Sequence, residues 1–414
     1  MTQKNSIIFL LILLFWLIGC QTSTTNDNTL NGRITVWHKR QPPESLVLET
    51  ALNTFQEANP QVEIVSVYIP PDQFLDEFKD SAKDGLAPDL IIGSEAWLPE
   101  LAEAGLIRPF EPTGTILALE RYATLTQYQG KSYGLPFSLS PQALYYNKAL
   151  VENPVTTLDD LLAAARKGDR IGFVPLFVPA YWGIEAFGEG LFDAEGNFTL
   201  AESGFVEWLT WLDDAQPIAG VIMSTDETSL RERFIQGDLH YYVAGPEELD
   251  TLRESMGDDA FGVTLLPAGP IGSAGPLLTA QLFMFYAHST KEQSQIANAL
   301  ARFFASQQQS NLFMRELEII PANPAVRVDP RLYPYVSGFA RQARTGTALP
   351  NELDKEQLYT AGNEAYINVL SEQVTPEEAV CTFGQQVAAI SGMSGRDINL
   401  PDGCELPDIE PDNS

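Results

Sequence analysis

Short runs of β-branched and apolar residues alternate with helical segments in the first part of this chain. Residues 33–37, 62–67 and 90–93 are rich in Ile, Val and Leu, which is typical of strands. Apolar residues between these runs recur at helical spacing, and a Gly or an Asn-Pro pair follows where each helix should end. Strands that alternate with helices favour a parallel sheet covered on both faces, so we expect an α/β fold.

The rest of the chain continues this mixture and is long enough for more than one domain. Further strands are expected near residues 143–147, 171–177, 240–246, 261–267 and 282–287. One helix is expected over residues 293–309, because their apolar side chains form a single stripe. Removal of residues 1–19 from the 414 leaves 395 residues, a length that predicts two or three domains.

The N-terminus resembles the export signal of a bacterial lipoprotein. The uncharged run 7–18 is too short for a membrane-spanning helix, which needs about 20 residues, but it is typical of a signal peptide. Leu17-Ile-Gly-Cys20 resembles a lipobox, in which the cysteine receives lipid before cleavage. We expect cleavage after residue 19, lipidation of Cys20 and a polar tether over residues 20–31. The alternatives are an ordinary signal peptide and an N-terminal membrane anchor.

The composition is strongly acidic. The 55 Asp and Glu residues outnumber the 25 Lys and Arg residues, which gives a formal net charge of −30 at pH 7. Nucleic-acid binding depends mainly on basic side chains that neutralise phosphates, so no nucleic-acid partner is expected. A large net charge also opposes self-association, and we expect a monomer.

Motifs that would indicate an enzyme or a metal site are missing from the sequence. It has no metalloprotease helix motif, no glycine-rich phosphate loop and no nucleophile elbow, and its 3 histidines do not have metal-ligand spacing. A carboxylate pair for glycoside hydrolysis could always be chosen among 55 acidic residues, so such a pair carries little information. We therefore expect no enzymatic activity, no cofactor and no metal.

Two cysteines remain besides Cys20. An even number of cysteines in an exported protein favours a disulfide, here between Cys381 and Cys404. This bond would tie the C-terminal tail, residues 399–414, to the preceding helix. The alternative is two buried free thiols.

Several short motifs within residues 32–392 resemble those of one protein family. In chain order they are Ile34-Thr-Val-Trp37, Phe55-Gln-Glu-Ala-Asn59-Pro60, Gly85-Leu-Ala-Pro88-Asp89, Gly130-Lys-Ser-Tyr-Gly-Leu-Pro136, Phe234-Ile-Gln-Gly-Asp238, Ile320-Pro321 and Thr375-Pro-Glu-Glu-Ala379. Each motif alone is weak, whereas their order and spacing are specific. The chain thus resembles the solute-binding proteins of ABC importers, in particular the group similar to maltose-binding protein.

The resemblance implies two α/β lobes of the type II periplasmic-binding-protein fold, joined by hinge strands. Lobe 1 would comprise residues 32–138 and 281–322, and lobe 2 would comprise residues 142–276 and 326–398. Ligand would bind between the lobes. Loops at the C-terminal ends of parallel strands, where α/β sheets generally bind ligands, would line this site.

The resemblance and the predicted strand ends together suggest which residues contact the ligand. Aromatic side chains offer flat faces to sugar rings, and polar side chains bind hydroxyl groups. The candidates are Trp37, Lys39, Arg40, Gln41, Glu95 and Trp97 in lobe 1, Ser140, Gln142 and Gln281 on the crossings, and Tyr181, Trp182, Glu247 and Tyr359 in lobe 2. For Tyr181 and the tryptophans, the alternative is a place in the core.

The acidic residues with which maltose-binding proteins hold maltodextrins are replaced here. Ser140 stands at the first-crossing position, and no acidic residue lies near Pro179. We therefore expect a sugar or oligosaccharide other than maltose. A polyol or a glycerol phosphate derivative stays open as the ligand, with Lys39 and Arg40 as anion partners.

The expected function is that of a lipid-anchored protein that captures a carbohydrate and delivers it to an ABC permease. It would act on the outer face of the cytoplasmic membrane, at the cell surface or in the periplasm. A surface glycoside hydrolase is one alternative. A ligand-sensing lipoprotein of the same fold, acting with a receptor, is the other.

Overall fold

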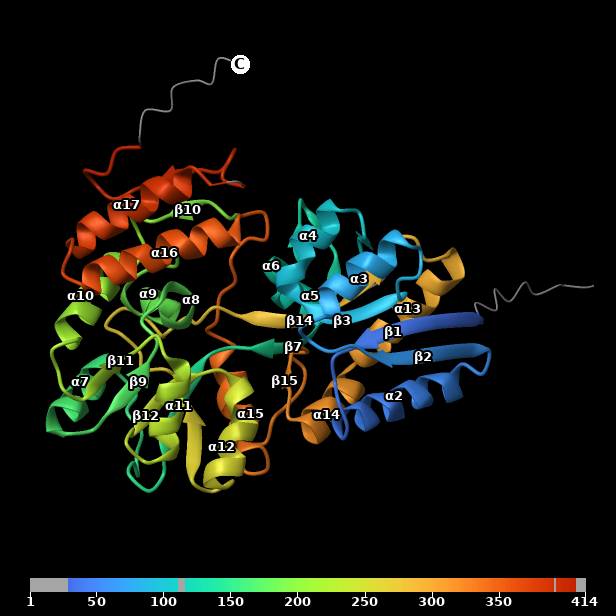
Figure 1. Ribbon diagram of the computed structural model, residues 1–414, viewed down its shortest axis with the longest axis horizontal. Coiled ribbons are helices and arrows are strands. Elements are labelled where there is room, and N and C mark those ends of the chain that lie inside the picture. The colour runs from blue at the N-terminus through green and yellow to red at the C-terminus, as the bar shows by residue number, and fades with distance from the viewer. Residues whose placement is uncertain (1–28, 111–115, 391, 407–414) are drawn as a thin grey trace, which may run out of the picture.

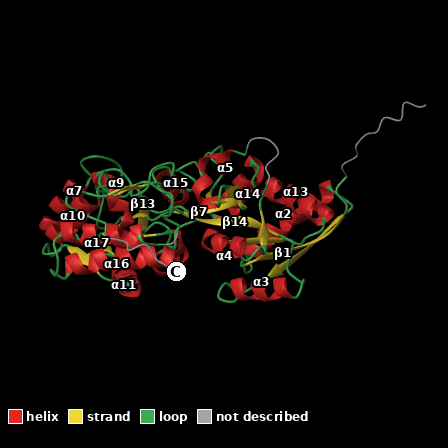
Figure 2. Cartoon of the chain, turned by 90° about the horizontal axis from the view of Figure 1, so that it is seen from above, coloured by secondary structure: helices red, strands yellow, loops and turns green. Residues whose placement is uncertain are grey.

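The computed structural model describes residues 29–110, 116–390 and 392–406. The chain forms two lobes, each built on its own β-sheet, which lie side by side (Figures 1 and 2). The predicted signal peptide and the lipidation site Cys20 lie outside the described residues. Within the part of the chain that is described, none of the helices combines the length and apolar character that crossing a membrane requires.

The lobe 1 sheet has the strand order β15-β7-β14-β3-β1-β2, and β4 pairs with β14. Strands β1, β2 and β3 are parallel, whereas β14, β7 and β15 are antiparallel to their neighbours. The strands are β1 (Gly32–His38), β2 (Val62–Tyr68), β3 (Leu90–Ser94), β4 (Ile107–Arg108), β7 (Gly134–Ser140), β14 (Thr279–Tyr286) and β15 (Ile320–Pro321). The hairpin β5 (Gln127–Tyr128) and β6 (Lys131–Ser132) precedes β7.

Both faces of the lobe 1 sheet are buried, which explains the uninterrupted apolar sequence of β14. Phe283 and Phe285 pack on one face of the sheet with Leu48 and Phe304. Met284, between them in the strand, belongs to the hydrophobic core that contains Phe74. The helices of lobe 1 are α2 (Glu44–Ala58), α3 (Phe74–Lys83), η1 (Glu95–Trp97), α4 (Leu98–Glu103), α5 (Leu117–Arg121), α6 (Ala123–Thr126), α13 (Lys291–Phe304) and α14 (Gln307–Leu317).

The lobe 2 sheet has the order β11-β9-β12-β8-β13, with three parallel strands followed by two antiparallel ones. Its strands are β8 (Ala143–Asn147), β9 (Ile171–Phe173), β11 (Val221–Met223), β12 (Tyr241–Ala244) and β13 (Phe261–Thr264). Its helices are α7 (Leu158–Lys167), α8 (Phe177–Ala180), η2 (Tyr181–Gly183), α9 (Ile184–Phe187), α10 (Phe205–Ala215), α11 (Glu227–Ile235), η3 (Pro246–Glu248), α12 (Leu249–Met256), α15 (Pro334–Gln342), α16 (Lys355–Leu370) and α17 (Pro376–Ala388). A small sheet joins β10 (Phe198–Thr199) to β16 (Ile398–Asn399).

The chain passes between the two sheets at three places. The first crossing, residues 141–142, joins β7 to β8, and the second, residues 265–278, joins β13 to β14. The third crossing, residues 322–333, leads from β15 to α15. In Figure 1, β7, β14 and β15 lie between the two bodies of the molecule.

Two predicted elements differ from the structure. The single helix expected over residues 293–309 is broken into α13 and α14, because the Ser306 hydroxyl accepts a hydrogen bond from the Gln309 amide at 3.3 Å and begins a new helix. The strand expected over residues 171–177 ends at Phe173. Pro175 follows, and it has no N–H group to donate to a sheet.

The structure places a disulfide between Cys381 of α17 and Cys404 of the tail, and their Cα atoms are 5.4 Å apart. The tail is also paired with lobe 2 through β16 and β10. The C-terminal segment is therefore fastened to lobe 2 at two points.

Candidate ligand site between the lobes

Two loops of lobe 1 leave the same edge of its sheet. Strands β1 and β3 are parallel neighbours, so the residues that follow them lie close together. Lys39, Arg40 and Gln41 follow β1, and the short helix η1, Glu95–Trp97, follows β3. Six of the predicted ligand residues are thus gathered at one edge when Trp37, the second-last residue of β1, is included.

Glu95 is the most buried charged side chain in this group. It is 5% exposed, and its Oε2 atom accepts hydrogen bonds from the Ala280 amide at 2.9 Å and the Ser94 hydroxyl at 3.3 Å. Burial raises the pKa of Glu95, and the hydrogen bond from Ala280 opposes this change. Glu95 therefore holds the start of β14 while it carries a poorly solvated carboxylate.

Lobe 2 presents Lys355 and Tyr359 to this carboxylate from α16. The two residues are four positions apart and share one face of the helix. The Lys355 ammonium donates to Asn351 Oδ1 at 2.8 Å; burial lowers the pKa of Lys355, whereas Glu95 raises it. Burial raises the pKa of Tyr359 to about 12, and Glu95 acts in the same direction. Glu95 is thus electrostatically coupled to both side chains across the lobe boundary.

The three residues after β1 differ in how they are held. Within the described part of the chain, the half-buried Lys39 ammonium has no hydrogen-bond or ion-pair partner; burial and then Arg40 lower its pKa, whereas Glu95 raises it. Arg40 donates to Glu44 Oε2 at 2.8 Å and lies over the Phe137 ring at 5.5 Å. Gln41 is exposed and donates to the Tyr68 hydroxyl at 2.6 Å.

The two tryptophans of lobe 1 pack around Phe74. The Trp97 ring stacks on Phe74 with a centroid distance of 5.3 Å and covers Gly93, where a Cβ atom would meet the ring at 2.4 Å. Trp97 is only half-buried, so part of its ring stays available. Trp37 is 9% exposed and contacts Phe74 edge-on at 6.2 Å, which makes it mainly a core residue.

The crossing residues provide polar groups next to Glu95. Ser140 ends β7, and its carbonyl accepts a hydrogen bond from the Thr279 hydroxyl at 3.3 Å. Gln281 is paired in register with Ser94, directly beside Glu95. Gln142 and Gln281 are half-buried, and the side-chain oxygen of each is enclosed without a hydrogen-bond partner among the described residues.

The lobe 2 aromatic pair lies elsewhere than expected. Tyr181 and Trp182 are each 1% exposed and belong to the core of lobe 2, where Trp182 packs on Trp208 at 4.7 Å. Because β9 ends early, these residues lie in η2, where Trp182 packs against Trp208 of α10, and their side chains are enclosed in the core of lobe 2. Glu247 follows β12, is exposed, and accepts a hydrogen bond from the Gly245 amide at 3.1 Å.

Lys355 and Asn351 were missed by the sequence reasoning. The position of Lys355, one helical turn before Tyr359, was a signal that could have identified it. Asn351 had no such signal, because its role depends on lobe 1 backbone groups that are far away in the sequence.

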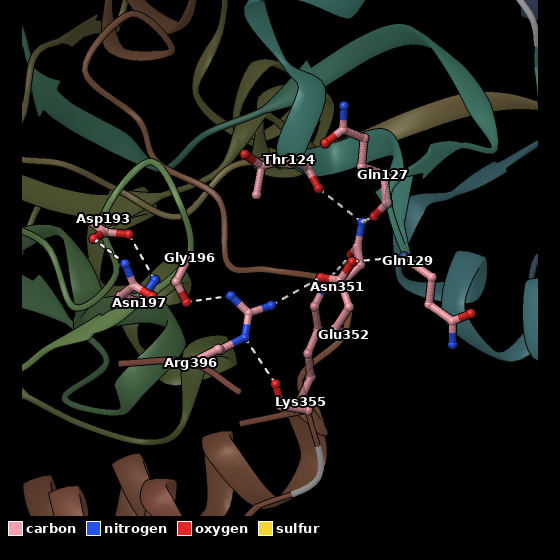
Figure 3. Close-up of polar contacts among 11 residues, drawn as sticks. Thr124, Gln127, Gln129, Asp193, Gly196, Asn197, Asn351, Glu352, Lys355 and Arg396 are labelled. Carbon is pink, nitrogen blue, oxygen red and sulfur yellow. Dashed lines mark hydrogen bonds and ion pairs between the residues drawn. The ribbon is translucent and has the colours of Figure 1, made fainter. Parts of the chain in front are cut away.

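A second set of contacts joins the lobes near Asn351 (Figure 3). The Asn351 amide is 2% exposed and donates to the carbonyls of Thr124 and Gln127 at 2.9 Å each. The Glu352 carboxylate accepts a hydrogen bond from the backbone N–H of Gln129 at 2.8 Å and forms an ion pair with Arg396 at 3.4 Å. The end of the segment that leads into α16 is therefore bonded to lobe 1.

A cavity of about 460 Å³ lies beside these contacts. Lobe 1 contributes residues 121–130 in part, and lobe 2 contributes residues 192–196, part of 346–352 and Arg396. This cavity is bordered by other residues than the predicted ligand contacts, but it adjoins the group around Glu95, because Asn351 lines it and accepts a hydrogen bond from Lys355.

Comparisons with known proteins agree with this architecture. A protein of Brucella abortus (strain 2308), named as a binding protein, is 26% identical over 273 residues, which are 59% of this chain and 66% of that protein. The chain thus covers just under two thirds of the length of this relative. The maltotriose-binding protein of Pyrococcus abyssi (strain GE5 / Orsay) is 25% identical over 342 residues, 77% of this chain and 73% of that protein.

The fold is also found among solved structures. A cyclo/maltodextrin-binding protein in complex with maltotetraose superimposes with a TM-score of 0.74 at 21% identity, covering 86% of this chain and 96% of that one. The predicted two-lobed α/β fold of type II is therefore confirmed. Residues 50–332 match the family model of bacterial extracellular solute-binding proteins. The chain belongs to this family.

Proposed function

We propose that this protein binds a carbohydrate between its lobes and delivers it to an ABC permease in the membrane. The observation that carries the proposal is the two-lobed fold, in which the loops after β1 and β3 lie at one edge of the lobe 1 sheet and Asn351, just before α16 of lobe 2, is bonded to lobe 1. A molecule at this place would touch both lobes at once. A sugar as the ligand is supported by the name of the relative from Pyrococcus abyssi, a maltotriose-binding protein, and by the maltotetraose bound in the solved maltodextrin-binding protein.

The mechanism is non-covalent. The lobes interconvert between open and closed arrangements by rotation about the three crossings. Lobe 1 would then comprise residues 32–138 and 281–322, and lobe 2 would comprise residues 142–276 and 326–398. Ligand favours closure because it gains contacts with both lobes only in the closed arrangement. The permease would then distinguish the closed, loaded shape from the open, empty one.

The proposed contacts combine one flat side chain with several polar ones. Trp97 would stack on a sugar ring, while Lys39, Tyr359 and the amide groups of Gln142 and Gln281 would bind hydroxyl or acidic groups. The position at which maltodextrin binders carry an acidic residue is Ser140, which supports a ligand other than maltose.

The export signal and Cys20 support a lipid anchor on the outer face of the membrane. Mass spectrometry of the mature protein from its native host tests this part of the proposal. The expected result is an N-terminal peptide that begins at Cys20 and carries acyl chains; an unmodified N-terminus would contradict it.

Thermal unfolding with a panel of sugars tests the binding function. A ligand present at about 100 times its dissociation constant adds roughly 2.7 kcal/mol to the free energy of unfolding, which raises the melting temperature. Release of product from chromogenic glycosides would instead indicate a glycoside hydrolase and would contradict the proposal.

A further inference from the structure

The charged groups around Glu95 do not balance. Arg40 is paired with Glu44 at 2.8 Å, so these two charges cancel. Glu352, the other carboxylate that acts on Lys355, is paired with Arg396 at 3.4 Å. Glu44 also acts on Lys39, but it is already bonded to Arg40. What remains is two ammonium groups, Lys39 and Lys355, and the one carboxylate of Glu95 that acts on both. The group therefore lacks one negative charge.

The surplus positive charge is concentrated on Lys39. Lys355 donates a hydrogen bond to Asn351 at 2.8 Å, and the Glu95 carboxylate is bonded to Ala280 at 2.9 Å. Lys39 is half-buried and is the member of the group for which the described residues offer no hydrogen-bond or ion-pair partner. A partly desolvated ammonium without a partner is unfavourable, and an anionic group beside it would relieve this cost.

This local excess of positive charge stands out in a chain with a net charge of −30. At physiological ionic strength, interactions between charges are largely screened beyond about 8 Å, so the distant acidic surface does not cancel the field of Lys39 at contact distance. A bound anion would therefore interact electrostatically mainly with the nearest side chains.

We propose that the sugar is an acidic one, and that its carboxylate pairs with Lys39 while its ring lies between Trp97 of lobe 1 and Tyr359 of lobe 2. This inference rests on the proposed sugar-binding function and specifies its substrate class. The ligand carboxylate completes the charge balance of Lys39, Glu95 and Lys355, and the resulting pairing holds the two lobes together.

The size of the imbalance decides between a carboxylate and a phosphate. A phosphate monoester carries about −1.5 to −2 charges at pH 7, whereas a carboxylate carries −1. The group lacks one negative charge, which matches the carboxylate. The site therefore fits a uronic acid or an oligosaccharide that contains one.

Titration calorimetry on the mature protein tests the inference. The probes are glucose, glucuronate and glucose 6-phosphate, the three corresponding galactose derivatives, and trigalacturonate. At least one uronate-containing probe should bind roughly tenfold or more tightly than its neutral counterpart, because hydrogen bonds to charged groups are the stronger ones. Added NaCl should weaken uronate binding more than neutral sugar binding.

The variant Lys39→Met keeps the length of the side chain and removes its charge. It should weaken uronate binding by roughly tenfold or more and weaken neutral-sugar binding much less, because a charge-assisted hydrogen bond is about twice as strong as a neutral one. Lys167→Met, at the exposed C-terminal end of α7, makes the same charge change away from the site and should alter neither.

Three results would overturn the inference. They are equal or tighter binding of the neutral sugar, tighter binding of the phosphate, and uronate binding that Lys39→Met does not weaken. In each of these cases a bound sugar leaves the proposed function standing. If none of the sugars binds, the proposed function fails together with the inference.

Discussion

The backbone amide of Ala280 donates a hydrogen bond to the carboxylate of Glu95 at 2.9 Å, so the first side chain after β3 holds the start of β14. This bond joins the loop that presents Trp97 to the strand by which the chain re-enters lobe 1. The same carboxylate acts on Lys355 and Tyr359 of lobe 2. Glu95 therefore links the hinge region, the candidate ligand site and the opposing lobe.

Replacement of Glu95 separates its roles as an acceptor and as a charge. Glu95→Ala leaves the buried Ala280 amide unpaired and should lower the free energy of unfolding by about 1–3 kcal/mol. Glu95→Gln keeps an acceptor and removes a carboxylate whose pKa is raised by burial, so its stability at pH 7 should equal or exceed that of the wild type. Urea denaturation of the two variants measures the difference; equal destabilisation of both would contradict this account.

Trp97 and Trp182 should respond differently to replacement by alanine. Trp97 is half-buried at the candidate site, and Trp97→Ala should weaken sugar binding by about 1–3 kcal/mol while the fold is kept. Trp182 is 1% exposed in the lobe 2 core, and Trp182→Ala should cost about 3–5 kcal/mol of stability. Calorimetric binding and thermal melts of both variants test this pair. A stable Trp182→Ala protein that has lost binding would contradict the assignment of Trp182 to the core.

Glu185 should make the stability of the protein depend on pH near neutrality. Burial raises its pKa from 4.5 to about 7, and its carboxylate packs against Gly275 in the second crossing. A group whose pKa is higher in the folded state contributes stability that is complete below the unfolded pKa and is lost as pH rises through the folded pKa. Stability should therefore fall between about pH 4.5 and 7, by on the order of 3 kcal/mol from this group.

Melting temperatures of wild type and Glu185→Gln at several pH values test this expectation. The variant should lose much of the decline between pH 5 and 8, because glutamine does not titrate. Glu189, exposed and the other carboxylate that raises the pKa of Glu185, provides the control Glu189→Gln, which should retain most of the decline. Parallel pH profiles for wild type and Glu185→Gln would count against a titrating Glu185.

Asn351→Ala should loosen the arrangement of the lobes. The substitution removes two hydrogen bonds to lobe 1 carbonyls, which together contribute roughly 2 kcal/mol to the present arrangement. Spin labels at Lys83→Cys in lobe 1 and Lys167→Cys in lobe 2 report the interlobe distance. The distance distribution should broaden and shift in Asn351→Ala, whereas Asn311→Ala, whose amide donates within α14, should leave it unchanged. An unaltered distribution in Asn351→Ala would mean that these bonds do not hold the lobes.

The architecture was largely predictable because it depends on local patterns. Apolar runs and helix-ending signals indicated β1, β2 and β3, and the ordered motifs indicated the two lobes. The break between α13 and α14 was missed because a single capping serine interrupts an apolar stripe that continues on both sides.

The candidate site was less predictable. The place of residues that follow strand ends, such as Lys39, Glu95 and Trp97, at one edge of the sheet could be predicted because it depends on the sheet alone. Tyr181 and Trp182 were misplaced toward the ligand, since an aromatic loop and an aromatic core segment have the same composition. Lys355 could have been proposed from its place one helical turn before Tyr359, but its relation to Glu95 could not, because that depends on how the two lobes are arranged.

If this protein retains a sugar between its lobes without altering it, the sugar can be recovered intact from the denatured protein. The mature protein is incubated with a mixture of neutral and acidic sugars, freed of unbound material and denatured. Mass spectrometry then identifies the small molecules that denaturation releases. About one equivalent of a single sugar, unchanged in mass, is expected. Release of no sugar, or of a sugar shortened or otherwise modified, would contradict the proposed function.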